Sequence, residues 1–294
     1  MFRGKQHYNV LLVSINVVMN GMRPTAKRIV LELLSAATNH EAQASGLIEA
    51  AGLLGVGESN VRVTLTRLVA SGVLEIEGRG LYRLGRAAQG VTRQVTGWRD
   101  LEKQVRRWDG GWVAVTTKAS RERAESAKAS RALRMFGFRA VEPGLELRPD
   151  NLEGSVDGLR ARLQTLGMPE DMLVFGAARF DPVTEGRARA MWDAERLDAS
   201  YVHTKERIER WLVSAADLDP RASAREVFFF GGDVLRQIVF DPRLPEPLVD
   251  VAKRRAMVDA ARRLDAYGRR VWSRLFGLPK GLHVQEDIHD IQWS

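Results

Sequence analysis

The segment from Gly55 to Gly85, GVGESNVRVTLTRLVASGVLEIEGRGLYRLG, most constrains the fold because its apolar period changes halfway along. From Val61 to Val69 the apolar residues recur at the spacing of one helical face, and Gly72 ends that helix. The next residues alternate between apolar and polar as two short strands, 73–77 and 81–84, around a glycine-rich tip. The segment therefore predicts a helix followed directly by a β-hairpin.

Two further helices are predicted ahead of this segment. The stretch TAKRIVLELLSAA after Pro24 places its apolar residues on one helical face, and SGLIEAAGLLG forms a second helix with Ser45 as its N-cap. Three helices followed by a hairpin, with short turns between them, describe a winged helix-turn-helix. In that fold the second helix of the motif enters the major groove of DNA. We therefore expect such a domain over residues 1–88.

The polar face of the third helix provides the candidate DNA contacts. It carries small polar side chains and arginines opposite the apolar stripe. Arginine can donate to guanine edges or phosphates, and serine, asparagine and threonine can reach bases or the backbone. We assign duplex contacts to Ser59, Asn60, Arg62, Val63, Thr66 and Arg67 and, on the hairpin, to Arg79 and Arg83. The alternative is that this helix and hairpin pack against another protein.

Positive charge is concentrated at the N-terminal end of the chain. The formal net charge is +8, and residues 1–95 contain 11 Lys and Arg against 6 Asp and Glu. The counts are 15 against 13 for residues 96–184 and 19 against 18 for residues 185–294. Basic side chains near phosphates gain affinity by releasing condensed counterions, so the asymmetry suits a nucleic-acid-facing N-terminal domain.

The amino-acid composition restricts the class of protein and its expected cellular location. With 294 residues, 45% of them hydrophobic, we expect two or three folded domains, each with its own core. The chain has no cysteine, which excludes disulfides and thiolate metal sites and makes the cytoplasm the expected location. The run NVLLVSINVVMN is too short and too interrupted by polar residues to span a bilayer, and no signal-peptide cleavage pattern follows it.

The rest of the chain predicts an α+β middle and a helical end. Residues 89–110 have the apolar spacing of a linker helix. Residues 111–182 alternate strand and helix: WVAVTT, a helix over 120–136, the extended stretch FRAVEPGLEL, a helix over 152–166, and MLVFGAARF. This order is compatible with a ferredoxin-like sheet. Residues 183–294 form an α-helical domain whose predicted helices are 185–199, 201–216, 222–240 and 249–276.

The chain resembles the PaaX-type transcriptional repressors of aromatic-acid catabolism. The resemblance is carried by LLGVGESNVRVTLTRLVASGVLEIEGRGLYRLG and continues in WDGGWVAVTT, LRMFGFRAVEPGLELRPDN and FDPRLPEPL, so it covers most of the sequence. It implies a central domain similar to the small CRISPR-associated ferredoxin-like nuclease. Such a nuclease needs an acidic metal ligand at the end of its first strand, where this chain has Thr116, Thr117 and Lys118. We therefore interpret this domain as a dimerisation scaffold, with a metal-dependent nuclease as the alternative.

The resemblance also implies an aryl-coenzyme A effector or a related aromatic acid. Such a ligand needs an apolar slot for its ring and donors for its negative charges. We assign the effector to Trp192, Tyr201, His203, Trp211, Arg255 and Arg262. Each of these has a structural alternative: the aromatic residues as core, His203 as a structural histidine, and the arginines as a solvated face neutralised by nearby acids. The tail HVQEDIHDIQW could bind a divalent ion, but a frayed end is the simpler interpretation.

The expected function is that of a homodimeric repressor released from a pseudo-palindromic operator by its effector. No nucleophile elbow, phosphate-binding loop, zinc signature or dinucleotide fingerprint occurs in the sequence. We therefore expect neither an enzyme nor a cofactor. A protein-interaction scaffold that uses the winged helix without DNA is a third possibility.

Overall fold

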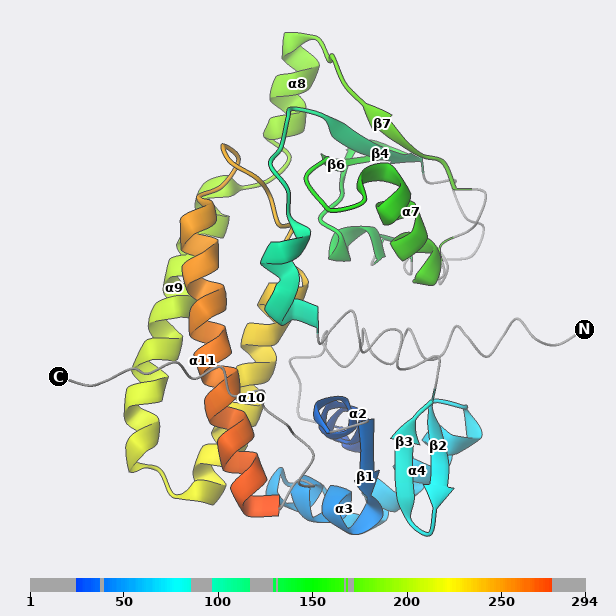
Figure 1. Ribbon diagram of the computed structural model, residues 1–294, viewed down its shortest axis with the longest axis vertical. Coiled ribbons are helices and arrows are strands. Elements are labelled where there is room, and N and C mark those ends of the chain that lie inside the picture. Colours follow the sequence, from blue (N-terminus) through cyan, green and yellow to red (C-terminus); the bar gives the residue numbers. More distant parts are fainter. Residues whose placement is uncertain are drawn as a thin grey trace, which may run out of the picture.

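The computed structural model describes residues 25–37, 40–85, 97–116, 129–130, 132–166, 168 and 172–276. They form a mixed α+β structure with two small antiparallel sheets and a helical C-terminal region (Figure 1). The three-stranded sheet lies near one end of the long helices and the four-stranded sheet near the other. No helix in the described ranges combines the length and apolar character that a bilayer span requires.

The N-terminal region contains three helices and the smaller sheet. Its elements are α2 (Ala26–Ala36), β1 (Glu41–Gln43), α3 (Ala44–Leu53), α4 (Glu58–Ala70), β2 (Leu74–Gly78) and β3 (Leu81–Leu84). The strands pair antiparallel in the order β1-β3-β2. The side chain of Thr25 caps α2 by accepting a hydrogen bond from the Arg28 amide.

Strand β1 was not expected from the sequence, and it moves the start of α3. Because Gln43 pairs with Leu81 and the Ala44 amide donates to the Gly80 carbonyl at 2.8 Å, the chain enters the helix directly from the strand. Helix α3 therefore begins at Ala44 with Gln43 at the N-cap position, and the predicted cap at Ser45 is wrong.

The larger sheet is built around β4 (Trp112–Thr116). With β5 (Arg139–Glu142), β6 (Leu145–Pro149) and β7 (Val174–Ala177) it forms an antiparallel sheet in the order β5-β6-β4-β7. Val113 and Val115 pack on one face in a core that includes α7 (Ser155–Thr165). Trp112 and Ala114 pack on the other face in a core that includes Trp192. Of the predicted helix over 120–136, residues 129–130 and 132–136 are described; 129–130 and 132–135 are helical, and 136 is in a turn.

The segment before this sheet differs from the predicted linker helix over 89–110. Residues 86–96 lie outside the described part, and a 3₁₀ helix, η2 (Gly97–Gln104), ends six residues earlier than expected. The physical reason is a competing set of partners: Val105 pairs with Leu152 as an isolated bridge, and the Arg106 amide donates to the Asn151 carbonyl at 2.8 Å.

The C-terminal region consists of helices. They are α8 (Pro182–Arg189), α9 (Ala194–Ser214), the short η3 (Ala215–Asp217), α10 (Pro220–Val239) and α11 (Val251–Phe276). The predicted break between 199 and 201 is wrong: α9 continues through Ser200, whose hydroxyl donates back to the Leu197 carbonyl instead of capping a new helix. The true break lies before Asp193, whose carboxylate caps α9 by accepting from the Arg196 amide.

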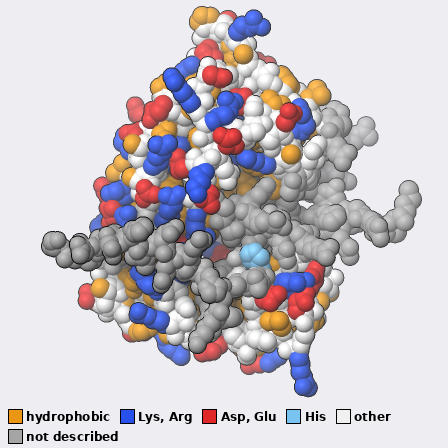
Figure 2. Space-filling model, in the orientation of Figure 1, with side chains coloured by type: hydrophobic (Ala, Val, Ile, Leu, Met, Phe, Trp, Pro, Cys, Tyr) orange, Lys and Arg blue, Asp and Glu red, His pale blue; other side chains and the backbone are white. Residues whose placement is uncertain are grey.

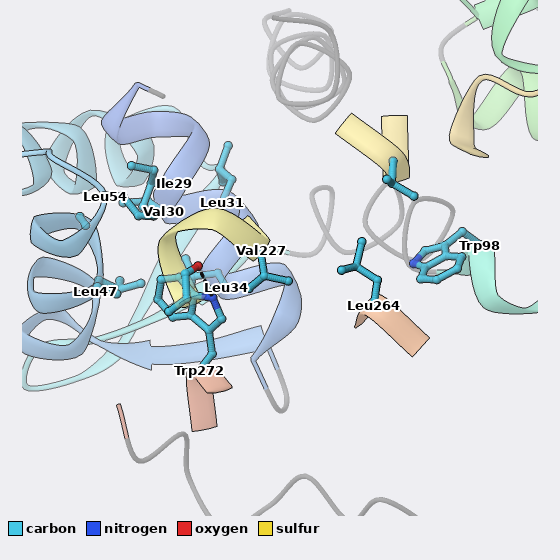
Figure 3. Close-up of a cluster of buried hydrophobic side chains, with 14 of the residues drawn as sticks. Ile29, Val30, Leu31, Leu34, Leu47, Leu54, Trp98, Val227, Leu264 and Trp272 are labelled. Atoms are coloured by element: carbon cyan, nitrogen blue, oxygen red, sulfur yellow. Dashed lines mark hydrogen bonds between the residues drawn. The ribbon is translucent and has the colours of Figure 1, made fainter. Parts of the chain in front are cut away.

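The N-terminal region shares its core with the long helices. Leu34 of α2 and Leu47 of α3 belong to the same buried cluster as Val227 of α10 and Trp272 of α11 (Figure 3). The Trp272 indole donates to the Ala224 carbonyl at 3.2 Å, which fixes α11 against α10. The expectation that each domain buries a core of its own is therefore wrong for this pair of regions.

Candidate nucleic-acid interface

Helix α4 has one buried and one open face. Val61, Leu65 and Leu68 are buried against the N-terminal core. All six predicted contact residues on the helix are exposed: Ser59, Asn60, Arg62, Val63, Thr66 and Arg67. Gly57, at the N-cap position, provides no side-chain cap, so the first amides of α4 can serve an external anion. The open face can therefore donate hydrogen bonds and also offers the apolar side chain of Val63.

Two of these residues already have local partners. The Arg62 guanidinium lies 2.7 Å from the Glu58 carboxylate one turn earlier, and the Thr66 hydroxyl donates to the Arg62 carbonyl at 3.1 Å. An exposed ion pair of this kind contributes at most about 1 kcal/mol, so Arg62 can leave it for a stronger partner. Arg67 forms no ion pair with any described acid.

The β2–β3 hairpin places its two arginines differently. Arg79 is exposed at the tip, between Gly78 and Gly80, whose φ angles of 157° and 76° let the chain turn there. Arg83 lies between Glu75, at 2.8 Å, and Glu77. The hydrogen bond with Glu75 is the main reason that the pKa of the Arg83 guanidinium is raised. Arg79 is thus available to a duplex, whereas Arg83 braces the hairpin.

The predicted effector residues do not converge on one pocket. Trp192 is buried on the larger sheet, where its ring stacks on Trp112 at 6.2 Å and its indole donates to the Gly137 carbonyl. Tyr201 is fully buried in α9, and burial raises the pKa of its hydroxyl above the ordinary value. Trp211 is half-buried at the other end of α9, where its indole donates to Glu226. Trp192 therefore belongs to the core of the larger sheet, whereas Tyr201 and the half-buried Trp211 pack in the cluster of the long helices.

The polar effector candidates divide between α9 and the contact of α11 with η2. His203 is exposed on α9. Arg255 lies 3.2 Å from Glu102, while Arg262 pairs with Asp259 at 2.6 Å and donates to the Arg99 carbonyl. Figure 2 shows basic and acidic side chains interspersed over the helical side of the molecule. The arginine rows of α11 are thus largely neutralised.

A hollow between α9 and α10 was missed by sequence reasoning. It has a volume of about 460 Å³ and is lined by Thr204, Arg207, Asp233, Val234, Arg236, Gln237 and Phe240. We refer to it as the α9–α10 hollow. No short motif marks these residues, because two helices contribute them from positions that are about 30 residues apart.

A buried polar joint was also missed. The Arg148 guanidinium donates to Asn151 at 2.7 Å, and the Asn151 amide donates to the Arg243 carbonyl at 2.8 Å. Nearby, Arg254 is 1% exposed and lies 3.0 Å from Glu102. Burial opposes ionisation of Glu102, but its hydrogen bonds with the neighbouring arginines hold the pKa of the carboxyl below its usual value. The joint connects η2 and the larger sheet to α11 and the segment that precedes it.

Among the described residues, no three or more His, Asp or Glu side chains come together as a possible metal site. The tail HVQEDIHDIQW lies outside the described residues, as does the run NVLLVSINVVMN.

Comparison with known proteins gives a likeness of fold. No family model and no curated protein matches the chain. Among solved structures it is similar to the uncharacterized protein Rv0674 from Mycobacterium tuberculosis, with 23% sequence identity and a TM-score of 0.54. The similarity covers 84% of this chain and 98% of that one. The fold is therefore shared over most of the length of both proteins.

Proposed function

We propose that the protein is a homodimeric, ligand-responsive transcriptional repressor of the kind that the PaaX-type resemblance implies. It would act in the cytoplasm on an operon for the breakdown of aromatic compounds. A small aromatic acid or aryl-coenzyme A thioester would release it from a pseudo-palindromic operator. Because an effector can shift DNA affinity only through its differential affinity for two protein states, the ligand must favour a state with misplaced reading helices.

The observation that carries the proposal is the open face of α4. It presents Arg62, Arg67 and small polar side chains, and Glu58 is the only acidic residue of the helix. The element order α2, β1, α3, α4, β2, β3 supports a winged helix-turn-helix with α4 as the reading helix and β2–β3 as the wing. Arg79 at the wing tip would then reach the neighbouring minor groove or its phosphates.

The larger sheet supports a ferredoxin-like domain as the dimerisation scaffold. Its strand order, with the first strand, β4, beside both the third, β6, and the last, β7, fits a βαββαβ chain. A closed dimer has two-fold symmetry, so its two reading helices would contact half-sites separated by one helical turn of DNA or a multiple of it.

Selection from a random pool of duplex DNA tests the proposal. Purified protein should enrich a pseudo-palindromic sequence whose complex weakens steeply with salt, as counterion release requires. Enrichment of no sequence, or binding that is independent of salt, would favour a protein-interaction scaffold. The same incubation with magnesium separates the alternative nuclease, because a repressor retards the duplex and leaves it uncut.

Thermal stabilisation tests the effector half of the proposal. A ligand that binds the folded chain raises its melting temperature in proportion to the logarithm of ligand concentration over Kd. We expect a shift with at least one member of a panel of aromatic acids and their coenzyme A thioesters. The same compound should release the selected duplex, and stabilisation without release would contradict the linkage between the two sites.

A further inference from the structure

The lining of the α9–α10 hollow carries more positive than negative charge. Arg207 of α9 and Arg236 of α10 both line it, and neither pairs with an acid among the described residues. Asp233 is the only acid among its lining residues. By contrast, Arg255 and Arg262 on α11 are each held by a carboxylate. Two guanidiniums facing one cavity are therefore available to an external anion.

The rest of the lining suits a small organic molecule. Val234 and Phe240 provide apolar surface. Thr204 is buried and donates to the Gln237 side chain at 2.6 Å, so a fixed polar pair lies beside that surface. Arg207 lies over the Phe230 ring at 5.1 Å, which orients its guanidinium. A volume of about 460 Å³ is within the range of small-molecule sites, which combine apolar walls with a few fixed polar groups.

Helix α10 connects this hollow to the N-terminal region. A Cβ atom added at Gly232 would come within 2.8 Å of the Arg28 guanidinium of α2, so the two helices touch at this glycine. Arg28 is fixed there by Glu32 at 2.8 Å. Arg236 follows Gly232 by four residues, and positions four apart lie on the same side of a helix. A ligand on Arg236 would thus lie about one helical turn from the contact that holds α2.

We propose that the α9–α10 hollow binds a small organic anion, a carboxylate or phosphate attached to a group of about the size of one ring. We further propose that binding is transmitted to α2 through the contact between Gly232 and Arg28. This second half rests on the proposed function, because DNA affinity is the property that it regulates. Helix α2 packs on α4, so a displacement of α2 against α10 moves the reading helix.

Calorimetry on the full chain tests the site without DNA. Benzoate and phenyl phosphate serve as the carboxylate and phosphate probes, and benzyl alcohol serves as the uncharged control. We expect millimolar or tighter binding of at least one anion and none of the alcohol. Arg207→Gln and Arg236→Gln should each weaken that binding about tenfold or more. Arg210→Gln, on α9 but outside the lining, should leave it unchanged.

Unequal folding of these variants is excluded by comparing their melting temperatures with that of the Arg210→Gln protein. If neither anion binds, or if the two lining variants bind as tightly as the control, the proposed site is wrong. If benzyl alcohol binds as well as the anions, the site is apolar and the role of the arginines is wrong.

A pair of glycine variants tests the transmission. Gly232→Ala introduces a methyl group against Arg28, whereas a Cβ at Gly231 has no atom within 4 Å. In the wild type the bound anion should change DNA affinity about tenfold. The ratio of DNA affinity without the anion to that with the anion should stay the same in Gly231→Ala. In Gly232→Ala this ratio should approach one while the anion still binds. Equal ratios in both variants would overturn the transmission. If no DNA binds at all, the proposed function fails, while the calorimetric result still decides the site.

Discussion

The open face of α4 and the helix α11 both carry arginines, but they differ in what these arginines contact. On α4, Arg67 has no acidic partner among the described residues, and Arg62 shares one exposed pair. On α11, Arg255, Arg263 and Arg269 each lie within 3.2 Å of a carboxylate from η2, α9 or α11 itself. An arginine row in a sequence therefore does not by itself indicate an anion site, since acids from distant segments can neutralise it.

The largest expected effect distinguishes two arginines of α11 that both pair with an acid. Arg254 and Arg255 share Glu102, but Arg254 is 1% exposed and Arg255 is 63% exposed. Arg254→Ala should cost about 3–5 kcal/mol of unfolding free energy, because it leaves a carboxylate without its buried partner. Arg255→Ala should cost less than about 1 kcal/mol. Urea unfolding measures both, and similar losses would show that burial does not separate the two residues.

The second prediction compares an arginine of α4 that has no acidic partner among the described residues with an arginine of α11 that has one. Arg67→Ala should weaken DNA binding by about 1–3 kcal/mol and, if Arg67 contacts a phosphate, should lower the salt slope by about one. Arg263→Ala, which removes a partner of Glu209, should change DNA affinity less than about twofold. Gel retardation over a salt series measures both variants. An equal effect of the two substitutions would remove the distinction between the faces.

The third prediction concerns Arg28 and Glu32, an ion pair within α2 at the point where this helix meets Gly232 of α10. Burial raises the pKa of the Glu32 carboxyl to about 7, although Arg28 opposes that shift. In the unfolded chain the group ionises near 4.5, so its contribution to stability falls as the pH rises from about 4.5 through 7. Glu32→Gln removes this pH dependence. Across that pH range, the unfolding free energy of the variant should therefore rise by about 1–3 kcal/mol relative to that of the wild type. Thermal unfolding at several pH values checks it, with exposed Glu49→Gln as a control. A constant difference between Glu32→Gln and wild type would contradict the assignment.

The smallest expected effect is at the start of α4, the proposed reading helix. Glu58→Gln frees Arg62 from its partner and removes the only acid of α4. DNA affinity should rise by a few tenths of a kcal/mol to about 1 kcal/mol, and stability should change by less than about 0.5 kcal/mol. Fluorescence anisotropy with a labelled duplex resolves a change of this size. Weaker binding would mean that Glu58 orients Arg62 for its contact.

Local patterns predicted the parts of the fold that depend on nearby residues. The apolar stripe of α4 and the alternation of the hairpin are determined within about ten residues, and both elements end within one residue of the expected limits. Helix α10 begins at Pro220, two residues before the expected start, because the Asp219 carboxylate caps it by accepting from the Arg221 and Ala222 amides. Side chains on these elements, including the exposed Arg67 and Arg79, could therefore be assigned to a surface from the sequence.

Features that depend on distant partners could not be predicted in the same way. Strand β1 has three residues and exists because β3, about 40 residues later, pairs with it. Trp192 and Tyr201 were assigned to an effector although aromatic residues are more often core, and the packing of the larger sheet and of the long helices shows that both are buried. Arg255 is neutralised by Glu102, which lies about 150 residues earlier. The sequence pattern therefore identified surfaces more reliably than cavities.

The continuous core between α2, α3, α10 and α11 limits how the N-terminal region could be exchanged. Residues 25–85 excised alone would present Leu34 and Leu47 to solvent, and the remaining helices would lose the cover over Val227 and Trp272. A chimera that receives a new recognition specificity must therefore either keep those contact positions or replace them together with their counterparts on the long helices. The same constraint makes substitutions on the inner faces of α10 and α11 a route for altering the proposed operator recognition from a distance.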